Sequence, residues 1–424
     1  MTSRRIVTTY LVLTSLQTLA ASFIWGVNTL FLLDAGLSLT EAFVANAAFT
    51  AGMVIFEVPT GVVADTMGRR TSFILGAVTL LISTLAYLGL WQIQGGIILW
   101  ILVSALIGLG FTFFTGATEA WLVDALDATG FKGGVDRVFG KGQIVMGAAM
   151  LVGTVSGGFL GQVNMALPYL FRSGALVAVI ITAFLMMRDI GFTPERNGSV
   201  AHEVRTVLKA SIEHGIKNPP VRLFMLAALF ADGIFIWVFY AFQPYLLELI
   251  GDPSVVYVAG IAAATFAVSS MVGGSSVGFF AKRFQRRTSV LLLNIVIAGT
   301  GLILVGAADL LPTPSGFWVA VVLLVLVSMF SAVATPMRQA YLNAVIPSKQ
   351  RATVLSFASL MGSAGGVVAQ PVLGRVADVW SLSVGYVVAG VTALVQLPFV
   401  LRVRRLALSA DETSGKEVEQ AQLG

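Results

Sequence analysis

Long apolar stretches dominate this sequence and limit the folds that are open to it. A helix needs about 20 consecutive apolar residues to cross the hydrocarbon core of a bilayer. A soluble domain is about 25% charged, whereas 11% of these 424 residues are charged and 57% are hydrophobic. The sequence therefore predicts an all-α membrane protein with twelve transmembrane helices, over residues 7–33, 43–64, 71–91, 97–120, 142–163, 167–187, 221–249, 255–281, 288–308, 316–340, 352–377 and 382–401.

The positively charged residues gather on one side of these predicted helices. Arg172 and Arg375 lie toward the other side. Cytoplasmic loops of membrane proteins carry an excess of Lys and Arg, so we expect both termini in the cytoplasm and a multi-pass protein of the cell membrane, inner or plasma. A net charge of +5 that is spread in this way does not indicate a nucleic-acid partner. The basic segments are 4–5, 69–70, 132–141, 188–222, 282–287, 338–351 and 402–416.

One short segment occurs twice. The sequence GVVADTMGRRT at residues 61–71 returns as GFFAKRFQRRT at residues 278–288, which is 217 residues later. Gly61 and the two arginines are shared by both copies, which favours a role for them in the turn and in orientation. Lys282 stands where the first copy has Asp65. The repeat predicts a chain made of two equivalent halves.

The halves are predicted to be two pseudo-symmetric six-helix bundles, residues 1–188 and 221–405. Residues 189–220 form a predicted cytoplasmic linker that contains an amphipathic helix, and residues 406–424 form a polar tail that is predicted to be disordered. The linker helix would lie along the membrane surface or against the helix ends. Its apolar positions are Val200, Val204, Val207, Leu208, Ile212 and Ile216.

Polar or aromatic residues follow one face of every third predicted helix. Small and hydroxylated residues also serve to pack membrane helices closely, but a stripe on the first, fourth, seventh and tenth helices favours a polar central cavity. The tenth helix contributes Ser328, Ser331, Thr335 and Arg338. The predicted substrate-binding residues on the other three helices are Gln17, Trp25, Asn28, Thr112, Thr115, Phe235, Phe239, Tyr240 and Gln243.

With twelve spans and this basic turn, the sequence resembles the major facilitator superfamily of secondary transporters. The family's signature between helices two and three is present without a gap as Gly61, Asp65, Gly68, Arg69 and Arg70. Its fifth-helix antiporter signature is kept only in part, because Ala149 and Thr154 replace a glycine and a proline. The resemblance implies two bundles that expose a central site alternately to the two sides of the membrane.

The basic turn suggests a one-sided gate. A carboxylate at the membrane edge needs a partner, and Asp65 has Arg69 one turn away. The resemblance implies a second partner, the positive N-terminal end of the eleventh helix near Ala352. Lys282 would be repelled there, so we expect Asp65 alone to act as the latch. The predicted gating residues are Gly61, Asp65, Gly68, Arg69, Arg70, Glu119 and Asp124; the alternative is that the turns only fix orientation.

The sequence has no GxxxxGK[ST] phosphate loop, so an ion gradient is the expected energy source. A proton-driven transporter needs a titratable group inside the membrane, and a buried carboxyl group can bind a proton near neutral pH. Asp232 is the deepest predicted carboxylate and Glu57 is the next. The alternatives are an ion pair for Asp232 and a structural hydrogen bond for Glu57.

The predicted cavity is aromatic and mildly acidic, which suits amphipathic or cationic molecules. Anionic substrates are disfavoured, because Arg338 is expected near the cytoplasmic end and Arg172 near the other. We therefore expect proton-coupled efflux of small molecules by a monomeric multidrug-type antiporter that confers drug resistance, and neither an enzyme, a cofactor nor a metal site. The alternatives are a proton-coupled transporter of a specific metabolite and, from another class, a lipid scramblase or a receptor.

Overall fold

The computed structural model describes residues 1–194, 205, 209 and 211–413, and these are overwhelmingly helical. In this part of the chain, eleven helical stretches are long and apolar enough to cross a membrane. The first predicted span is covered by α1 and α2. This agrees with the expected all-α fold of twelve transmembrane helices.

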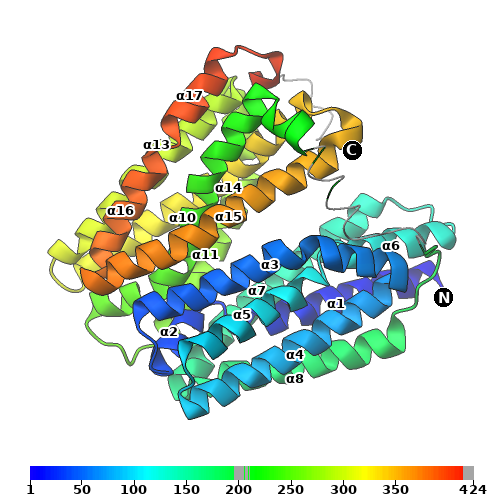
Figure 1. The fold of residues 1–424 in the computed structure, drawn as a ribbon, viewed down its shortest axis with the longest axis horizontal. Coiled ribbons are helices and arrows are strands. Elements are labelled where there is room, and N and C mark those ends of the chain that lie inside the picture. The colour runs from blue at the N-terminus through cyan, green and yellow to red at the C-terminus, as the bar shows by residue number, and fades with distance from the viewer. Residues whose placement is uncertain (195–204, 206–208, 210, 414–424) are drawn as a thin grey trace. The chain divides into compact units, whose positions relative to one another are not determined.

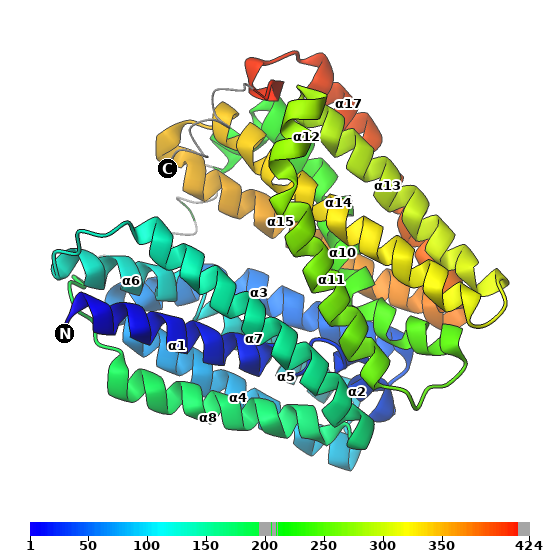
Figure 2. The ribbon, with the colours of Figure 1, turned by 180° about the vertical axis from the view of Figure 1, so that it is seen from behind.

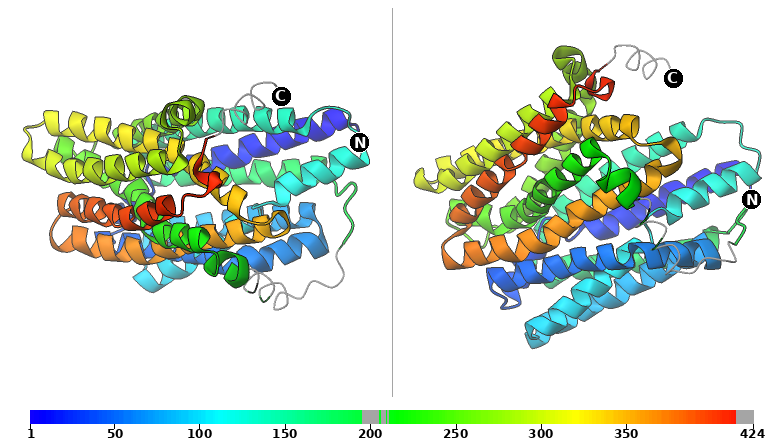
Figure 3. Two further views of the ribbon diagram at one scale, coloured as in Figure 1. Left: turned by 90° about the horizontal axis from the view of Figure 1, so that it is seen from above. Right: turned by 45° about the horizontal axis from the view of Figure 1, so that its top comes forward.

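The chain divides into two compact units. One comprises Met1–Val204 with Ser254–Ala264, and the other comprises Arg205–Pro253 with Thr265–Gly424. The division therefore passes through α11 (Tyr257–Ser275), which begins in the first unit and ends in the second. Figure 3 shows the long helices of each unit packed side by side.

Among the described residues, the first unit contains eight whole helices, coloured blue to green in Figure 1, and the beginning of α11. They are α1 (Ser3–Ser22), α2 (Asn28–Asp34), α3 (Leu39–Met67), α4 (Arg69–Ile93), α5 (Ile97–Thr112), α6 (Ala117–Ala128), α7 (Val135–Val163) and α8 (Ala166–Met186). Two predicted spans of this unit are interrupted. The chain leaves the helix between α1 and α2, and again between α5 and α6, where Gly116 has a φ of 71°.

The second unit contains the remaining long helices (Figure 2). They are α10 (Pro219–Ile250), most of α11, α12 (Val277–Phe284), α13 (Arg287–Ala307), α14 (Ser315–Val345), α15 (Arg351–Val379), α16 (Leu382–Leu394) and α17 (Leu397–Arg405). Short helical turns lie at η1 (Ser211–Ile216), η2 (Ala308–Leu310), η3 (Ser348–Gln350) and η4 (Ser409–Asp411).

The repeat seen in the sequence extends into the buried core of each unit. In the first unit the hydroxyl of Tyr169 donates to Oδ1 of Asn28 at 2.9 Å. The residues 217 positions later are Tyr386 and Tyr245, whose ring centroids lie 4.7 Å apart. The same two helical positions therefore contact each other in both halves.

The segments outside the bundles differ from expectation. The predicted disordered tail is wrong for residues 406–413, which turn back on the helices, and Asp411 is only 4% exposed. Val200, Val204, Val207 and Leu208 of the predicted linker helix lie outside the described residues. In η1 the buried residues are Ser211 and Gly215, whereas Ile212 and Ile216 are exposed.

Candidate functional site

The basic turn of the first unit links the end of α3 to the start of α4. Gly68 stands between the two helices with a φ of 104°, a backbone conformation that side chains other than glycine rarely adopt. Asp65 at the end of α3 accepts a hydrogen bond from Arg69 at the start of α4. Nε of Arg69 lies 3.9 Å from Oδ2 of Asp124 on α6. Three of the predicted gating residues, Asp65, Arg69 and Asp124, therefore lie together.

A carboxylate that the sequence analysis missed holds this turn. Oδ1 of Asp189 accepts from the backbone N–H of Arg70 at 2.9 Å, so Asp189 caps α4 from 119 residues away. In return, Nη2 of Arg70 donates to the carbonyl of Phe184 near the end of α8 at 2.7 Å. An acid at a helix N-terminus and a base at a C-terminus are both favourable. The two helix ends therefore stabilise each other.

The surroundings of Asp189 disfavour the ionised form of its carboxyl. The Asp189 side chain is exposed on one side, and partial burial of its carboxyl raises the pKa above its usual range, while the N–H and the guanidinium of Arg70 act in the other direction. A Cβ atom on Gly68 would collide with the Asp189 carboxylate. Gly68 is thus required by its φ angle, and the lack of a side chain there leaves room for the carboxylate.

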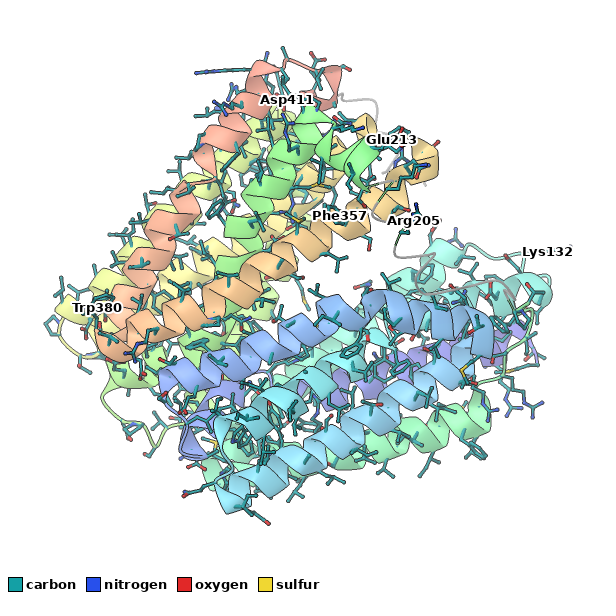
Figure 4. The ribbon with its side chains drawn as sticks, viewed as in Figure 1. Lys132, Arg205, Glu213, Phe357, Trp380 and Asp411 are labelled. Carbon is teal, nitrogen blue, oxygen red and sulfur yellow. The ribbon has the colours of Figure 1, made fainter. Side chains whose placement is uncertain are left out.

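The second unit has its own version of this cap. Asp411 accepts from the backbone N–H of Thr288 and from its hydroxyl, both at 2.8 Å, and Nη1 of Arg287 donates to the carbonyl of Ala410 at 2.7 Å. Figure 4 labels Asp411 just beyond the end of α17. Gln285, the counterpart of Gly68, also has a positive φ, of 53°. Both basic turns are therefore held by an acid that follows the last helix of their own bundle.

Two predicted gating residues lie outside this contact set. Gly61 is inside α3, and a Cβ atom there would meet open space, as it would at Gly278. The expectation that this shared glycine serves the turn is therefore wrong, since Gly68 has that role. Glu119 is exposed on α6 and interacts electrostatically with Tyr10 of α1.

Asp232, the predicted coupling residue, is paired. Its Oδ1 lies 3.3 Å from Nη1 of Arg338, and the two side chains are 33% and 28% exposed. Asp232 lies in α10 and Arg338 in α14, so Arg338 is level with the predicted coupling group rather than confined to the cytoplasmic end. On the third side is α15, where a Cβ atom on Gly362 would collide with the Asp232 carboxylate. The absence of that atom makes room for the carboxylate.

Glu57 lies on α3, two residues before Pro59, and is half-buried. Its backbone carbonyl accepts a bond from the Thr60 hydroxyl at 3.2 Å. A proline inside a helix removes one backbone hydrogen bond. Glu57 therefore lies next to a turn of α3 that lacks one backbone hydrogen bond.

The predicted substrate-binding residues differ in their surroundings. Asn28 is buried and donates to Oδ1 of Asn46 at 2.9 Å, Thr112 is buried and donates to the Leu109 carbonyl of its own helix, and Gln243 is fully buried. Side chains as buried as these offer a ligand no surface in this conformation. Gln17, Trp25, Phe239 and Tyr240 are partly buried, whereas Thr115 and Phe235 are exposed.

Arg172 lies inside the first unit rather than toward its outer end. It is 1% exposed, and its Nε donates to the Thr84 hydroxyl at 3.0 Å while Nη1 donates to the Ala20 carbonyl at 3.3 Å. Its guanidinium also lies 5.7 Å from the ring centroid of Phe111. Arg172 therefore ties together four helices of the bundle, α1, α4, α5 and α8.

The whole chain matches one family model. The model of the Major Facilitator Superfamily matches residues 10–275 and 225–421. The chain belongs to the major facilitator superfamily. It is therefore a multi-pass membrane transporter and not an enzyme, as expected.

Two curated relatives cover most of the chain. The uncharacterized MFS-type transporter YxaM of Bacillus subtilis (strain 168) is 21% identical over 389 residues, which is 90% of this chain and 92% of that protein. The tetracycline resistance protein, class G, of Vibrio anguillarum is 26% identical over 377 residues, 82% of this chain and 84% of that protein.

Solved structures of superfamily members share the fold. The nucleoside transporter NupG superposes with a TM-score of 0.78 at 12% identity, covering 94% of this chain and 98% of its own. A D-xylose-proton symporter superposes with a TM-score of 0.68 at 15% identity, covering 97% of this chain and 98% of its own.

Proposed function

We propose that the protein is a proton-coupled secondary transporter of amphipathic small molecules, in which Asp232 carries the coupling proton. The observation that supports this most is the partly buried ion pair of Asp232 with Arg338, which lies within two long membrane-spanning helices. Ionisable residues within membrane helices are rare, because they are costly, and they mark ion or proton pathways.

A proton on Asp232 would change how two helices are held. Protonation removes the negative charge that attracts Arg338, so the electrostatic link between α10 and α14 weakens. Pro336 lies inside α14, two residues before Arg338. Because a proline deletes a backbone hydrogen bond and favours a kink, α14 can bend where the link is released. Coupling of protonation to a helix movement is what alternating access requires.

Export is the first candidate direction. The similarity to a tetracycline resistance protein supports drug efflux, and the aromatic residues of α10 suit amphipathic compounds. A cationic substrate that competes with the proton for Asp232 would be exchanged for protons and expelled. The second candidate is uptake of a metabolite together with protons, which the presence of Arg338 beside Asp232 favours.

We also propose that Asp65 is a one-sided latch on the cytoplasmic face. Both termini and both basic turns are then cytoplasmic. Asp65→Asn is expected to slow transport more than Lys282→Asn when both proteins are present at equal levels. Equal activity of the two variants would contradict the proposed latch.

Transport by the purified protein in liposomes with an imposed pH gradient tests the coupling. Lipophilic cations, neutral drugs and small carboxylates serve as substrates. Asp232→Asn is expected to abolish the dependence of accumulation on the gradient. The matched control is Asp378→Asn, because Asp378 forms a peripheral ion pair with Arg375 at 3.9 Å in the same unit.

Two results would overturn the proposal. One is unchanged proton dependence in Asp232→Asn, and the other is lipid flipping without a gradient and without solute transport, which would indicate a scramblase.

A further inference from the structure

We propose that the basic turn of the second unit binds the headgroup of an anionic phospholipid. The binding residues are Lys282 and Arg283 at the end of α12 and Arg286 directly before α13. The surface is separate from the proposed coupling pair, so the proposal holds for any substrate or coupling ion. The lipid phosphate supplies this turn with the negative charge that two carboxylates supply to the first basic turn.

The two copies of the repeat differ in their acids. In the first unit Arg69 accompanies two carboxylates, since it is paired with Asp65 and lies 3.9 Å from Asp124. The second unit keeps the arginine, but the positions 217 residues after the two acids hold Lys282 and Tyr341. Both acids of the first turn have therefore been lost from the second.

Arg286 is the counterpart of Arg69, and its surroundings are basic. Arg286, Lys282 and Arg283 are all exposed, and none of the three forms an ion pair with another of the described residues. The backbone of Arg286 pairs with that of Glu412, whose side chain is exposed, whereas Asp411 is buried in the cap of α13. Three like charges so close in sequence repel one another, and an anion between them relieves the repulsion.

The turn lies at the edge of the membrane-spanning part of the unit. It is followed at once by α13, which begins at Arg287 and is apolar enough to cross a membrane. Phe279, one turn before Lys282 on α12, is 68% exposed. Exposed apolar surface next to cations matches a phospholipid, whose acyl chains adjoin its phosphate.

The end of α17 adds positive charge near this turn. Arg402 and Arg405 are exposed there, and the segment that follows is bonded through Asp411 to the first turn of α13. Clusters of Lys and Arg beside a membrane-spanning helix attract anionic lipids. Exposed side chains of this kind enclose no pocket for a soluble anion, whereas the acyl chains of a lipid hold its headgroup at this depth.

Three probes separate the parts of the ligand: short-chain phosphatidylglycerol, short-chain phosphatidylcholine and glycerol phosphate. Each is added to the purified protein in a neutral detergent, and the rise of the unfolding temperature is measured against probe concentration. Phosphatidylglycerol is expected to stabilise the protein most. Its effect should weaken as salt is added, because salt screens exposed charges. Phosphatidylcholine shows the contribution of the acyl chains, and glycerol phosphate that of a free phosphate.

A triple variant removes the site. Lys282→Gln, Arg283→Gln and Arg286→Gln together are expected to weaken phosphatidylglycerol binding roughly fivefold for each cation removed. Because the three side chains are exposed, the variant should fold, and without lipid it should unfold at no lower temperature than the natural protein. The matched control makes the same change of charge at three exposed cations of the first unit, by Lys132→Gln, Arg137→Gln and Lys141→Gln.

A charge reversal tests whether the lipid replaces the missing acids. Lys282→Asp restores the acid that the first copy has at this position, and the new carboxylate can pair with Arg286 as Asp65 pairs with Arg69. The unfolding temperature without lipid should rise, and the further gain from phosphatidylglycerol should shrink. An undiminished gain from phosphatidylglycerol would contradict the proposal.

Three other results would overturn the lipid site. Equal stabilisation by phosphatidylcholine would show that the headgroup charge is not recognised, and equal stabilisation by glycerol phosphate would indicate a site for a free anion. An equal loss of phosphatidylglycerol binding in the triple variant and its matched control would show that only the total charge matters.

Discussion

Asp411 binds both the backbone N–H and the hydroxyl of Thr288, across 123 residues of sequence. The contact fastens the segment after α17 to the first turn of α13. It is buried, and it makes a residue near the end of the chain part of the folded second unit.

Loss of this cap should destabilise the second unit. Asp411→Ala leaves the N–H and the hydroxyl of Thr288 without their acceptor, which is expected to cost about 1 to 3 kcal/mol. Thermal unfolding of the purified protein measures the effect. The adjacent exposed Glu412→Ala is the matched control and should change little. Equal effects of the two substitutions would contradict the cap.

Asp189 should give stability a particular pH dependence. Because burial raises the pKa of its carboxyl, the folded protein binds more protons than the unfolded chain between the usual pKa of Asp and the raised one. Its contribution to stability is therefore present at low pH and is lost as the pH rises through the raised pKa. Asp189→Asn keeps an oxygen acceptor for Arg70 and cannot ionise, so its unfolding temperature should fall less over that rise. The exposed Asp127→Asn should leave the pH profile unchanged.

The two turn positions should respond in opposite ways. Gly68→Ala forces a side chain into a φ of 104° and against Asp189, so the protein is expected to lose stability or fail to fold. Gln285→Gly relieves a positive φ and should raise stability by up to about 1 kcal/mol. Unfolding temperature and expression level check both. A stable Gly68→Ala protein would show that the turn can rearrange.

Gly362 should affect the proton dependence of transport, although it has no side chain that could bind a proton. Gly362→Ala places a methyl group where the Asp232 carboxylate lies, so the pair with Arg338 is displaced. Proton dependence of transport is expected to change while the protein stays folded. Gly274→Ala, where the added carbon meets open space, is the control. Normal pH dependence in Gly362→Ala would mean that the carboxylate has room elsewhere.

The membrane fold could be predicted from the sequence because its signal is local. Backbone N–H and C=O groups in the bilayer must form their hydrogen bonds within their own helix. Each membrane-spanning helix therefore appears in the sequence as one continuous apolar run. The interruption between α1 and α2 was missed because neighbouring apolar residues conceal it. Gly26 is the single glycine at residues 23–27, and that segment has no proline.

The candidate site could be predicted only in part. Asp65, Arg69 and Asp124 were expected to act together, and the structure places Arg69 beside both acids. Asp232 and Arg338 are 106 positions apart in the sequence. No local pattern shows that they lie at the same level on two neighbouring helices. The caps were missed for the same reason, since each acid lies outside the predicted spans and far along the chain from the amide that it binds.

The two caps do not follow the repeat. The residue 217 positions after Asp189 is Leu406, whereas the acid that caps the second half is Asp411. In each half a carboxylate accepts a hydrogen bond from the first turn of the helix that follows the basic turn, but the two carboxylates occupy different positions of the repeat. The unsatisfied N–H groups of the helix end therefore explain the cap better than inheritance from the duplication does. For protein engineering, a reporter fused directly after Arg405 removes this acid, whereas one fused after Thr413 retains it.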